Sequence, residues 1–403
     1  MIQIKPNHWL TIGLAAFAVV TSILFLLIPW QSMNGYQAVN NSTMSYYKAR
    51  VDQVVSETLS ADNLEPGRNL GTQEILVTLQ EGPNAGQQVE ILNYLNRTQN
   101  VEVSQGQTVI VCADEPEDAD PVYTVYSYYR NPAILGIILF FGALILIVGR
   151  GTGAKSLLGL AYTIFAVLLF LLQAIFHGLP SVPITLLTVT VTTIVSLLLM
   201  GGASKKSLAA ILSTISGLLL STGVFAVFQG LLHISGYTME EAESLLLVTQ
   251  ATGLDLGNLL LVSVLISSLG AVMDMSMSVA SPLEEIHRLN PEHGFAQLVR
   301  SGMNIGRDTI GTMTNTLIMA FTGTALTTML VLMGYGWSFQ QLLNSNYLAM
   351  ELAQSIASTT GVVLTVPVTS LIGAWMFTKW ERKGKAPASQ KAPARPPKKK
   401  KRA

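Results

Sequence analysis

The chain has 403 residues, of which 50% are hydrophobic and 12% are charged. Soluble globular proteins carry about 25% charged residues, so the composition excludes an ordinary soluble protein. The 24 basic and 24 acidic side chains leave no net charge, which does not support a nucleic-acid partner. Cys112 is the single cysteine, so the chain can form neither an internal disulfide nor a metal–thiolate cluster.

Long apolar runs that match the thickness of a bilayer predict about eight transmembrane helices. The expected spans are residues 8–30, 132–149, 156–177, 180–200, 207–232, 257–280, 309–333 and 351–378. The first run follows Lys5 and lacks a small-x-small cleavage motif, so residues 1–30 are expected to be an uncleaved anchor. A cleaved signal peptide is the alternative.

The segment between the first two spans, residues 31–131, is long enough to fold alone. Its alternating runs "ARVDQVV", "TQEILVTLQ", "QQVEILNYL" and "QTVIVCA" are separated by turn residues, a pattern that predicts a small barrel or sandwich of about five antiparallel strands. The expected fold class is therefore an all-α polytopic membrane protein with a small extracytoplasmic β-rich domain inserted between helices one and two. Residues 132–380 would form a seven-helix transmembrane domain.

Lys and Arg residues predict the orientation in the membrane. The loops on the side of the C-terminal tail carry Arg150, Lys155, Lys205, Lys206, Arg288, Arg300 and Arg307. The opposite side is rich in Asp and Glu between Asp52 and Asp120. Both termini are therefore expected in the cytoplasm. The Pro-rich basic tail, residues 381–403, is expected to be disordered and to contact anionic lipid headgroups.

The sixth expected span contains an intramembrane carboxylate, Asp274. One narrow face of this helix carries Ser263, Ser267, Gly270, Asp274, Ser278 and Ser281. Charges inside spans are costly and normally face protein or water, so Asp274 is expected in a small, hydroxyl-lined groove. Ser281, Pro282 and Glu284 resemble a capping box, which predicts that the span ends there and a cytoplasmic helix begins.

Polar residues recur at helical spacing in other spans as well. They include Thr185, Thr188, Thr192, Asp308, Thr312, Asn315, Glu351, Ser358, Thr365 and Thr369. The alternative is that such small polar residues only pack helices together. The run Met-Asp-Met-Ser-Met at 273–277 also raises a copper(I) site. Methionines at alternate positions of one helix point in divergent directions, however, which favours lipid-facing side chains.

Residues 281–308 are expected to form a cytoplasmic interfacial loop that couples to the groove. Its apolar stripe of Phe295, Leu298, Val299 and Met303 is typical of a segment lying along the membrane surface. The candidate gating residues are Gly302 and Gly306 as hinges, with Arg307 able to pair with Asp308 or to swing toward Asp274. A static interfacial helix is the alternative.

Three strings, "GAVMDMSMSVASPLEEI", "SGMNIGRDTIGTMTNTLIMAFTG" and "ELAQSIASTTGVVLTVPVTSLIGAW", resemble the YibE/YibF family of bacterial multi-pass membrane proteins. The resemblance covers about residues 31–380. It implies a plasma-membrane protein, commonly treated as a transporter and often with a partner of the same family. The matching residues are Gly270, Asp274, Gly306, Arg307, Asp308, Asn315, Thr316, Glu351, Pro367 and Thr369.

The function favoured by these patterns is gradient-driven transport of an unidentified solute or ion. Asp274 would bind a cation or proton, and the other candidate binding residues are Ser267, Gly270, Ser278, Thr312, Asn315, Glu351 and Thr369. The motifs of soluble enzymes are missing from the sequence, so no enzyme activity or cofactor is expected, and the identity of any metal stays open. The alternative is a membrane scaffold or accessory subunit whose outer domain recruits a partner, in a homo-oligomer or a hetero-oligomer.

Overall fold

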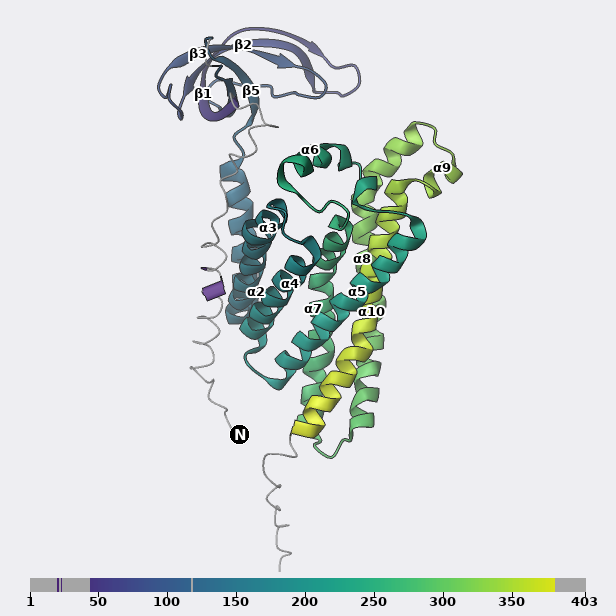
Figure 1. Cartoon of the computed structure of the whole chain (residues 1–403). Helices are drawn as coiled ribbons and strands as arrows, with labels where there is room; N and C mark the ends of the chain where they lie inside the picture. The colour runs from purple at the N-terminus through teal and green to yellow at the C-terminus, as the bar shows by residue number, and fades with distance from the viewer. Residues whose placement is uncertain (1–19, 22, 24–43, 117–118, 381–403) are drawn as a thin grey trace, which may run out of the picture. The chain divides into compact units, whose positions relative to one another are not determined.

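A computed structural model describes residues 20–21, 23, 44–116 and 119–380. The chain divides into two units, with residues 30–157 in one and residues 158–403, together with 1–29, in the other. Most of the expected anchor and the whole basic tail lie outside the described residues. Figure 1 labels most of the helices and strands.

Five antiparallel strands form one curved sheet, a half-barrel over residues 44–128. They are β1 (Met44–Ala61), β2 (Asn69–Leu79), β3 (Gln88–Leu95), β4 (Thr108–Asp114) and β5 (Val122–Tyr128). The strand order is β3-β2-β1-β4-β5, and the two edge strands β3 and β5 also approach each other. This confirms the predicted β-rich domain, because the four alternating runs fall on β1 to β4.

The concave face of the half-barrel is an apolar core. Every second residue of β2 is buried, and Val51, Ile75 and Val109 are fully buried, as the two-residue period of a strand requires. Gln73 is a buried polar exception, and its amide exchanges hydrogen bonds of 3.1 and 3.0 Å with the backbone of Val103. The amide therefore ties the segment before β4 to the sheet as a strand partner would.

The remainder of the described chain is helical. Its elements are α2 (Asn131–Phe165), the π-helix η2 (Ala166–Leu171), α3 (Leu172–Phe176), α4 (Ser181–Gly201), α5 (Lys205–Leu232), the 3-10 helix η3 (Gly236–Thr238), α6 (Ala242–Thr252), α7 (Leu259–Leu289), α8 (Phe295–Gly334), α9 (Phe339–Leu343) and α10 (Asn346–Trp380). Among the described residues, six helices are long and apolar enough to cross a bilayer: Asn131–Phe176, α4, α5, α7, α8 and Asn346–Thr378.

The second and third expected spans both fall within Asn131–Phe176, which is 46 residues long. The helical path is broken at Arg150, whose backbone adopts φ 47° and ψ −131°. Gly153 lies directly against the carbonyl oxygen of Ile145, a contact that eight residues of straight helix could not make. The chain therefore folds back near Arg150. The first expected span, 8–30, lies almost wholly outside the described residues.

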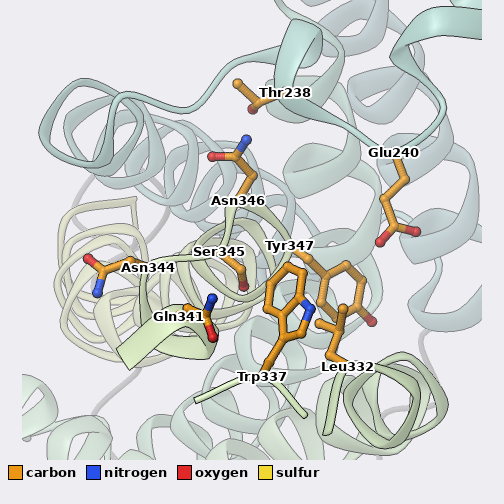
Figure 2. A pocket seen from close by; sticks show the side chains of 9 residues that line it. All are labelled: Thr238, Glu240, Leu332, Trp337, Gln341, Asn344, Ser345, Asn346 and Tyr347. Atoms are coloured by element: carbon orange, nitrogen blue, oxygen red, sulfur yellow. The ribbon is translucent and has the colours of Figure 1, made fainter. Parts of the chain in front are cut away.

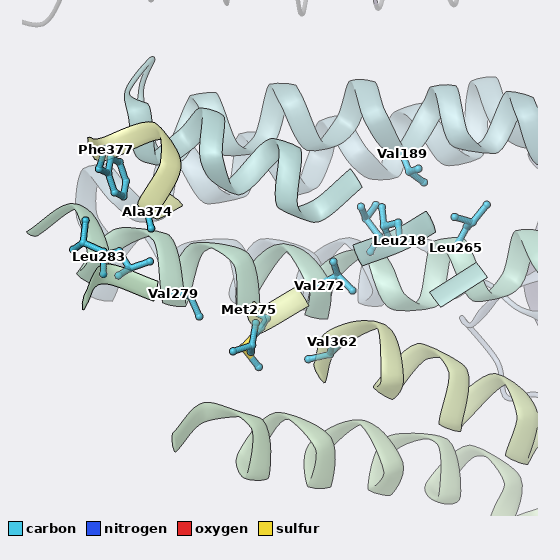
Figure 3. Packing of buried hydrophobic residues seen from close by; sticks show 13 residues of the cluster. Val189, Leu218, Leu265, Val272, Met275, Val279, Leu283, Val362, Ala374 and Phe377 are labelled. Carbon is cyan, nitrogen blue, oxygen red and sulfur yellow. The ribbon is translucent and has the colours of Figure 1, made fainter. Parts of the chain in front are cut away.

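Helix α7 is central to the packing of the helical unit. It contacts α4, α5, α8 and α10, while α10 also packs against α5 and α8. Figure 3 shows part of this core, in which Leu265, Val272 and Met275 of α7 meet Leu218 of α5 and Val362 of α10. Leu265 and Val272, two of these core residues of α7, lie on the opposite face of the helix from Asp274, since their positions differ from that of Asp274 by roughly half a helical turn.

The predicted helix break at Ser281 is wrong. Helix α7 continues through Pro282 to Leu289, although an internal proline costs a backbone hydrogen bond. The physical reason lies at the next residue. Leu283 is fully buried, and its side chain packs against both Gly302 of α8 and Gly373 of α10. Packing after the proline thus extends the helix.

The predicted interfacial loop 281–308 is also corrected. The connection between α7 and α8 spans only residues 290–294, and α8 is one helix of 40 residues that includes Gly302 and Gly306. Both glycines are sites of close packing, where an added Cβ would collide with Ser370 and Val366 of α10 respectively. Three residues of the apolar stripe face the protein core, since Leu298 is fully buried and Val299 and Met303 pack against the same cluster. The fourth, Phe295, is exposed.

Candidate functional site

Most hydroxyl side chains in the helical unit bond to their own helix. Thr188, Thr192 and Thr365 each donate to the carbonyl four residues earlier, at 2.8, 2.9 and 2.7 Å. Thr369 is fully buried and donates to the Thr365 carbonyl at 2.8 Å. The inward stripes of α4 and α10 therefore consist of satisfied hydroxyls at packed surfaces, which is how small polar residues serve helix packing.

Asp274 lies in a cavity of about 370 Å³ between three helices, named here the Asp274 cavity. It is lined by Leu197 and Met200 of α4, Met273, Asp274, Met277 and Ser278 of α7, and Met313 of α8. Asp274 itself is exposed in the isolated chain. The expected hydroxyl-lined groove is therefore wrong in its chemistry. Ser278 is the one hydroxyl in the lining, and methionines predominate.

Glu351 lies in a second cavity, the Glu351 cavity, of about 210 Å³. Its lining residues are Met239, Glu240, Glu241, Leu260, Ser263, Tyr347, Met350, Glu351 and Gln354. Three of them are carboxylates, and no Lys, Arg or His is among them. The potential in this cavity is therefore negative and favours cations.

The largest of these cavities, about 590 Å³, is named the aromatic cavity and is shown in Figure 2. Thr238 and Glu240 come from the segment that starts at η3. The other lining residues come from α8, α9, the start of α10 and the connections between these helices: Leu332, Trp337, Gln341, Asn344, Ser345, Asn346 and Tyr347. It shares Glu240 and Tyr347 with the Glu351 cavity. Sequence reasoning missed this cavity, although the aromatic and amide residues between the last two spans were a visible signal.

A polar face of α7 connects the Glu351 cavity with the Asp274 cavity. Ser263 lines the first cavity and Asp274 the second, about 16 Å apart along the helix at 1.5 Å per residue. Ser267 and Gly270 lie between them on the same face, and both are exposed. The Ser267 hydroxyl is 3.2 Å from that of Ser358 in α10. We call this row, from Ser263 to Ser278, the polar track.

Other candidate residues are not among those that line the Asp274 cavity or the Glu351 cavity. Thr312 and Asn315 are exposed on α8, and the Thr312 hydroxyl donates to the Thr309 carbonyl at 2.9 Å. Arg307 and Asp308 are exposed too, and within the described part of the chain they form no ion pair with each other. Their gating role stays a prediction.

Within the described ranges, no group of three or more His, Cys, Asp or Glu side chains is placed to hold a metal ion. The polar track therefore offers a single carboxylate, Asp274, with thioethers and one hydroxyl around it. The single carboxylate of Asp274 can neutralise one positive charge. These groups together do not supply the six to eight oxygen ligands that a calcium ion takes.

The family model described as YibE/F-like protein matches residues 137–379, a range that includes α4, α5, α7, α8 and most of α10. The match covers more than half of the chain and confirms the resemblance carried by the three sequence strings. It begins after the half-barrel, so the β-rich domain lies outside it. Comparisons with curated proteins and with solved structures found no match.

Proposed function

The chain belongs to the YibE/F-like family, and from that premise we propose that it is a plasma-membrane transporter that moves a cation along the polar track of α7. An ion or proton gradient would drive the movement, with Asp274 as the binding carboxylate. Both termini would lie in the cytoplasm, because Lys and Arg concentrate in the loops on the side of the C-terminal tail.

The observation that carries this proposal is the alignment of two cavities on one helix face. The Glu351 cavity is acidic, and the Asp274 cavity contains a further carboxylate, that of Asp274 itself. Ser263 and Ser267 provide hydroxyl oxygens between them. Carboxylates within membrane spans are costly and typically mark ion pathways or proton relays.

Energetic reasoning supports a cation at Asp274. An isolated carboxylate in an apolar environment is strongly disfavoured unless it is protonated or paired. The lining of its cavity contains no Lys, Arg or His that could pair with it. A transported cation or proton would provide the missing charge and would leave when the site opens to water.

The test is a flux measurement in proteoliposomes with a panel of H⁺, Na⁺, Rb⁺ and Ag⁺. Wild-type protein should move at least one of them, and Asp274→Asn should reduce that flux to the liposome background. Glu292→Gln is the matched control, because Glu292 is an exposed acid in the connection between α7 and α8. The transport proposal would be wrong if the wild-type protein moved none of the four cations, or if Asp274→Asn and wild type showed equal flux.

A scaffold or accessory subunit remains the second candidate, and one observation favours it. Four threonine hydroxyls of α4 and α10 bond within their own helices, those of Thr188, Thr192, Thr365 and Thr369. Helix α8 exposes Thr312, Asn315 and Thr316, where a neighbouring subunit could contact them. The partner would be a second copy or a protein of the same family. In this case Asn315→Leu should abolish co-purification of the partner, and Asp274→Asn should leave every flux unchanged.

A further inference from the structure

We propose that the Asp274 cavity binds a soft monovalent metal cation, copper(I) or its chemical analogue silver(I), through methionine thioethers with the Asp274 carboxylate as counter-charge. The inference rests on the proposed function, since it names the class of cation for the same cavity. It revises the expectation that the methionines near Asp274 face lipid.

The spacing of the methionines on α7 is the first argument. Met273 and Met277 are four residues apart, so they lie on one face, one turn from each other, and both line the cavity. Met275 is the residue that diverges, and it is fully buried in the core on the other side of the helix. Methionines at alternate positions of a helix point in divergent directions, and this excludes Met275 from the cavity. It does not exclude Met273 and Met277, which are four residues apart.

Neighbouring helices add two more thioethers. Met200 comes from the end of α4, and Met313 comes from α8. Four of the seven lining residues are thus methionines, although methionine accounts for 15 of the 403 residues of the chain. The enrichment arises from three separate helices, so it does not follow from a single methionine-rich stretch of sequence.

Methionine often fills irregular gaps in a core, and that is the ordinary explanation for such a cluster. Here the side chains surround an open volume of about 370 Å³. Met273, Met277 and Met313 are only partly buried, whereas Met275 is completely buried. Met273 and Met313 also pack against the core cluster around Leu265, and Met277 packs against the cluster around Ala280, so each contacts packed residues on one side and lines the cavity on the other.

The ligand chemistry then selects the cation. Thioethers are soft, neutral ligands that prefer copper(I), while magnesium and calcium require hard oxygen ligands. Zinc is held by Cys, His and carboxylate groups, and Asp274 is the one such group in the lining. A monovalent cation with one carboxylate has no net charge, so it avoids leaving an unpaired charge in an apolar environment.

The test is equilibrium binding of silver(I) to the full chain in detergent, with silver as a probe that does not change oxidation state. All variants carry Cys112→Ser, because the sulfur of Cys112 is itself a soft ligand outside this cavity. Met273→Leu with Met277→Leu removes two thioethers and preserves side-chain volume. The matched control is Met319→Leu with Met333→Leu, since both residues are highly exposed and neither lines the cavity.

The Cys112→Ser protein should bind one silver ion per chain with high affinity in excess sodium and magnesium. The Met273/Met277 double variant should bind at least tenfold more weakly, and the control variant should be unchanged. Equal weakening in both double variants, or no binding to the parent protein, would overturn the proposal. The size-exclusion profile and thermal unfolding of each variant show whether it is folded, and Met313→Leu alone provides a milder change.

Binding and transport are measured separately, so their failures are distinguishable. Silver binding that depends on Met273 and Met277 without any flux would remove the transport proposal and retain the metal site. Flux of H⁺, Na⁺ or Rb⁺ that depends on Asp274, in a protein that binds no silver, would remove the metal site and retain transport.

Discussion

The hydroxyls of Ser267 in α7 and Ser358 in α10 lie 3.2 Å apart and join the two helices between the Glu351 cavity and the Asp274 cavity. Ser358 is fully buried, whereas Ser267 is exposed. The polar track is thus anchored to the packed core at one point and open on its other side. This contact adds one hydrogen bond to the extensive packing of α7 against α10.

Replacing Ser358 with Ala should cost little stability and leave transport intact. Ser267 keeps a second acceptor, the Val264 carbonyl at 3.3 Å, and hydrogen bonds between membrane helices contribute about 0.6 kcal/mol on average. Reversible unfolding in mixed micelles measures the change. Loss of all flux in a folded Ser358→Ala protein would mean that the Ser358 hydroxyl contacts the solute itself.

Gly306→Val should strongly destabilise the helical unit. A Cβ at Gly306 would collide with Val366 of α10, and overpacking of this kind costs about 1–3 kcal/mol. Gly311→Val is the matched control, because nothing lies within 4 Å of a Cβ at Gly311 in the same helix. Thermal unfolding in detergent provides the comparison.

The collision between a side chain at position 306 and Val366 can be relieved by shortening Val366. Val366→Ala combined with Gly306→Val should recover part of the lost stability, since the two residues share one contact and their effects are then non-additive. Strictly additive losses would show that Gly306 and Val366 do not meet.

Within the described residues, the long apolar helices and the strands could be predicted from the sequence, because each depends on local periodicity. The alternation of buried and less buried residues in β2 and the apolar run of α5 can each be recognised from a short stretch of sequence. Prediction from the sequence failed where tertiary packing overrides a local signal. Pro282 and its flanking residues resemble a helix start, but burial of Leu283 between Gly302 and Gly373 carries the helix through.

The candidate site was predicted in part for a similar reason. Helical spacing correctly placed Asp274 and Ser278 on one face of α7, and both line one cavity. Spacing within one helix cannot show which residues of other helices approach that face. Met200 and Met313 arrive from α4 and α8, so the methionine lining and the aromatic cavity appear only after the helices are packed.

Replacing Cys112 with Ser should lower the pKa of Tyr46 in the half-barrel. These residues face each other in the β1–β4 pair, and the charge of the Cys112 sulfur is the largest cause that raises the pKa of Tyr46 above its usual value. A neighbouring negative charge disfavours a phenolate, so its removal favours ionisation at lower pH. Ultraviolet difference titration, with Tyr46→Phe subtracted, isolates this tyrosine. An unchanged titration curve would contradict the effect.

The proposed orientation predicts opposite labelling of two cysteines. Cys112 should react with an impermeant maleimide only from outside the cell. In a Cys112→Ser background, Asn290→Cys, in the connection between α7 and α8, should react only from inside. Labelling of both positions from one side would exclude a membrane crossing pattern that separates the half-barrel from this connection.

Silver(I) entry into proteoliposomes tests the central claim most directly, because the rate of entry depends on the Asp274 carboxylate, on metal binding in its cavity and on transport together. All proteins carry Cys112→Ser, and internal silver is measured by mass spectrometry at early times under an imposed pH gradient. The account predicts rapid entry with the parent protein and with Glu292→Gln, and entry at the protein-free rate with Asp274→Asn. Equal entry with the parent protein and Asp274→Asn would contradict a role for the Asp274 cavity in cation movement.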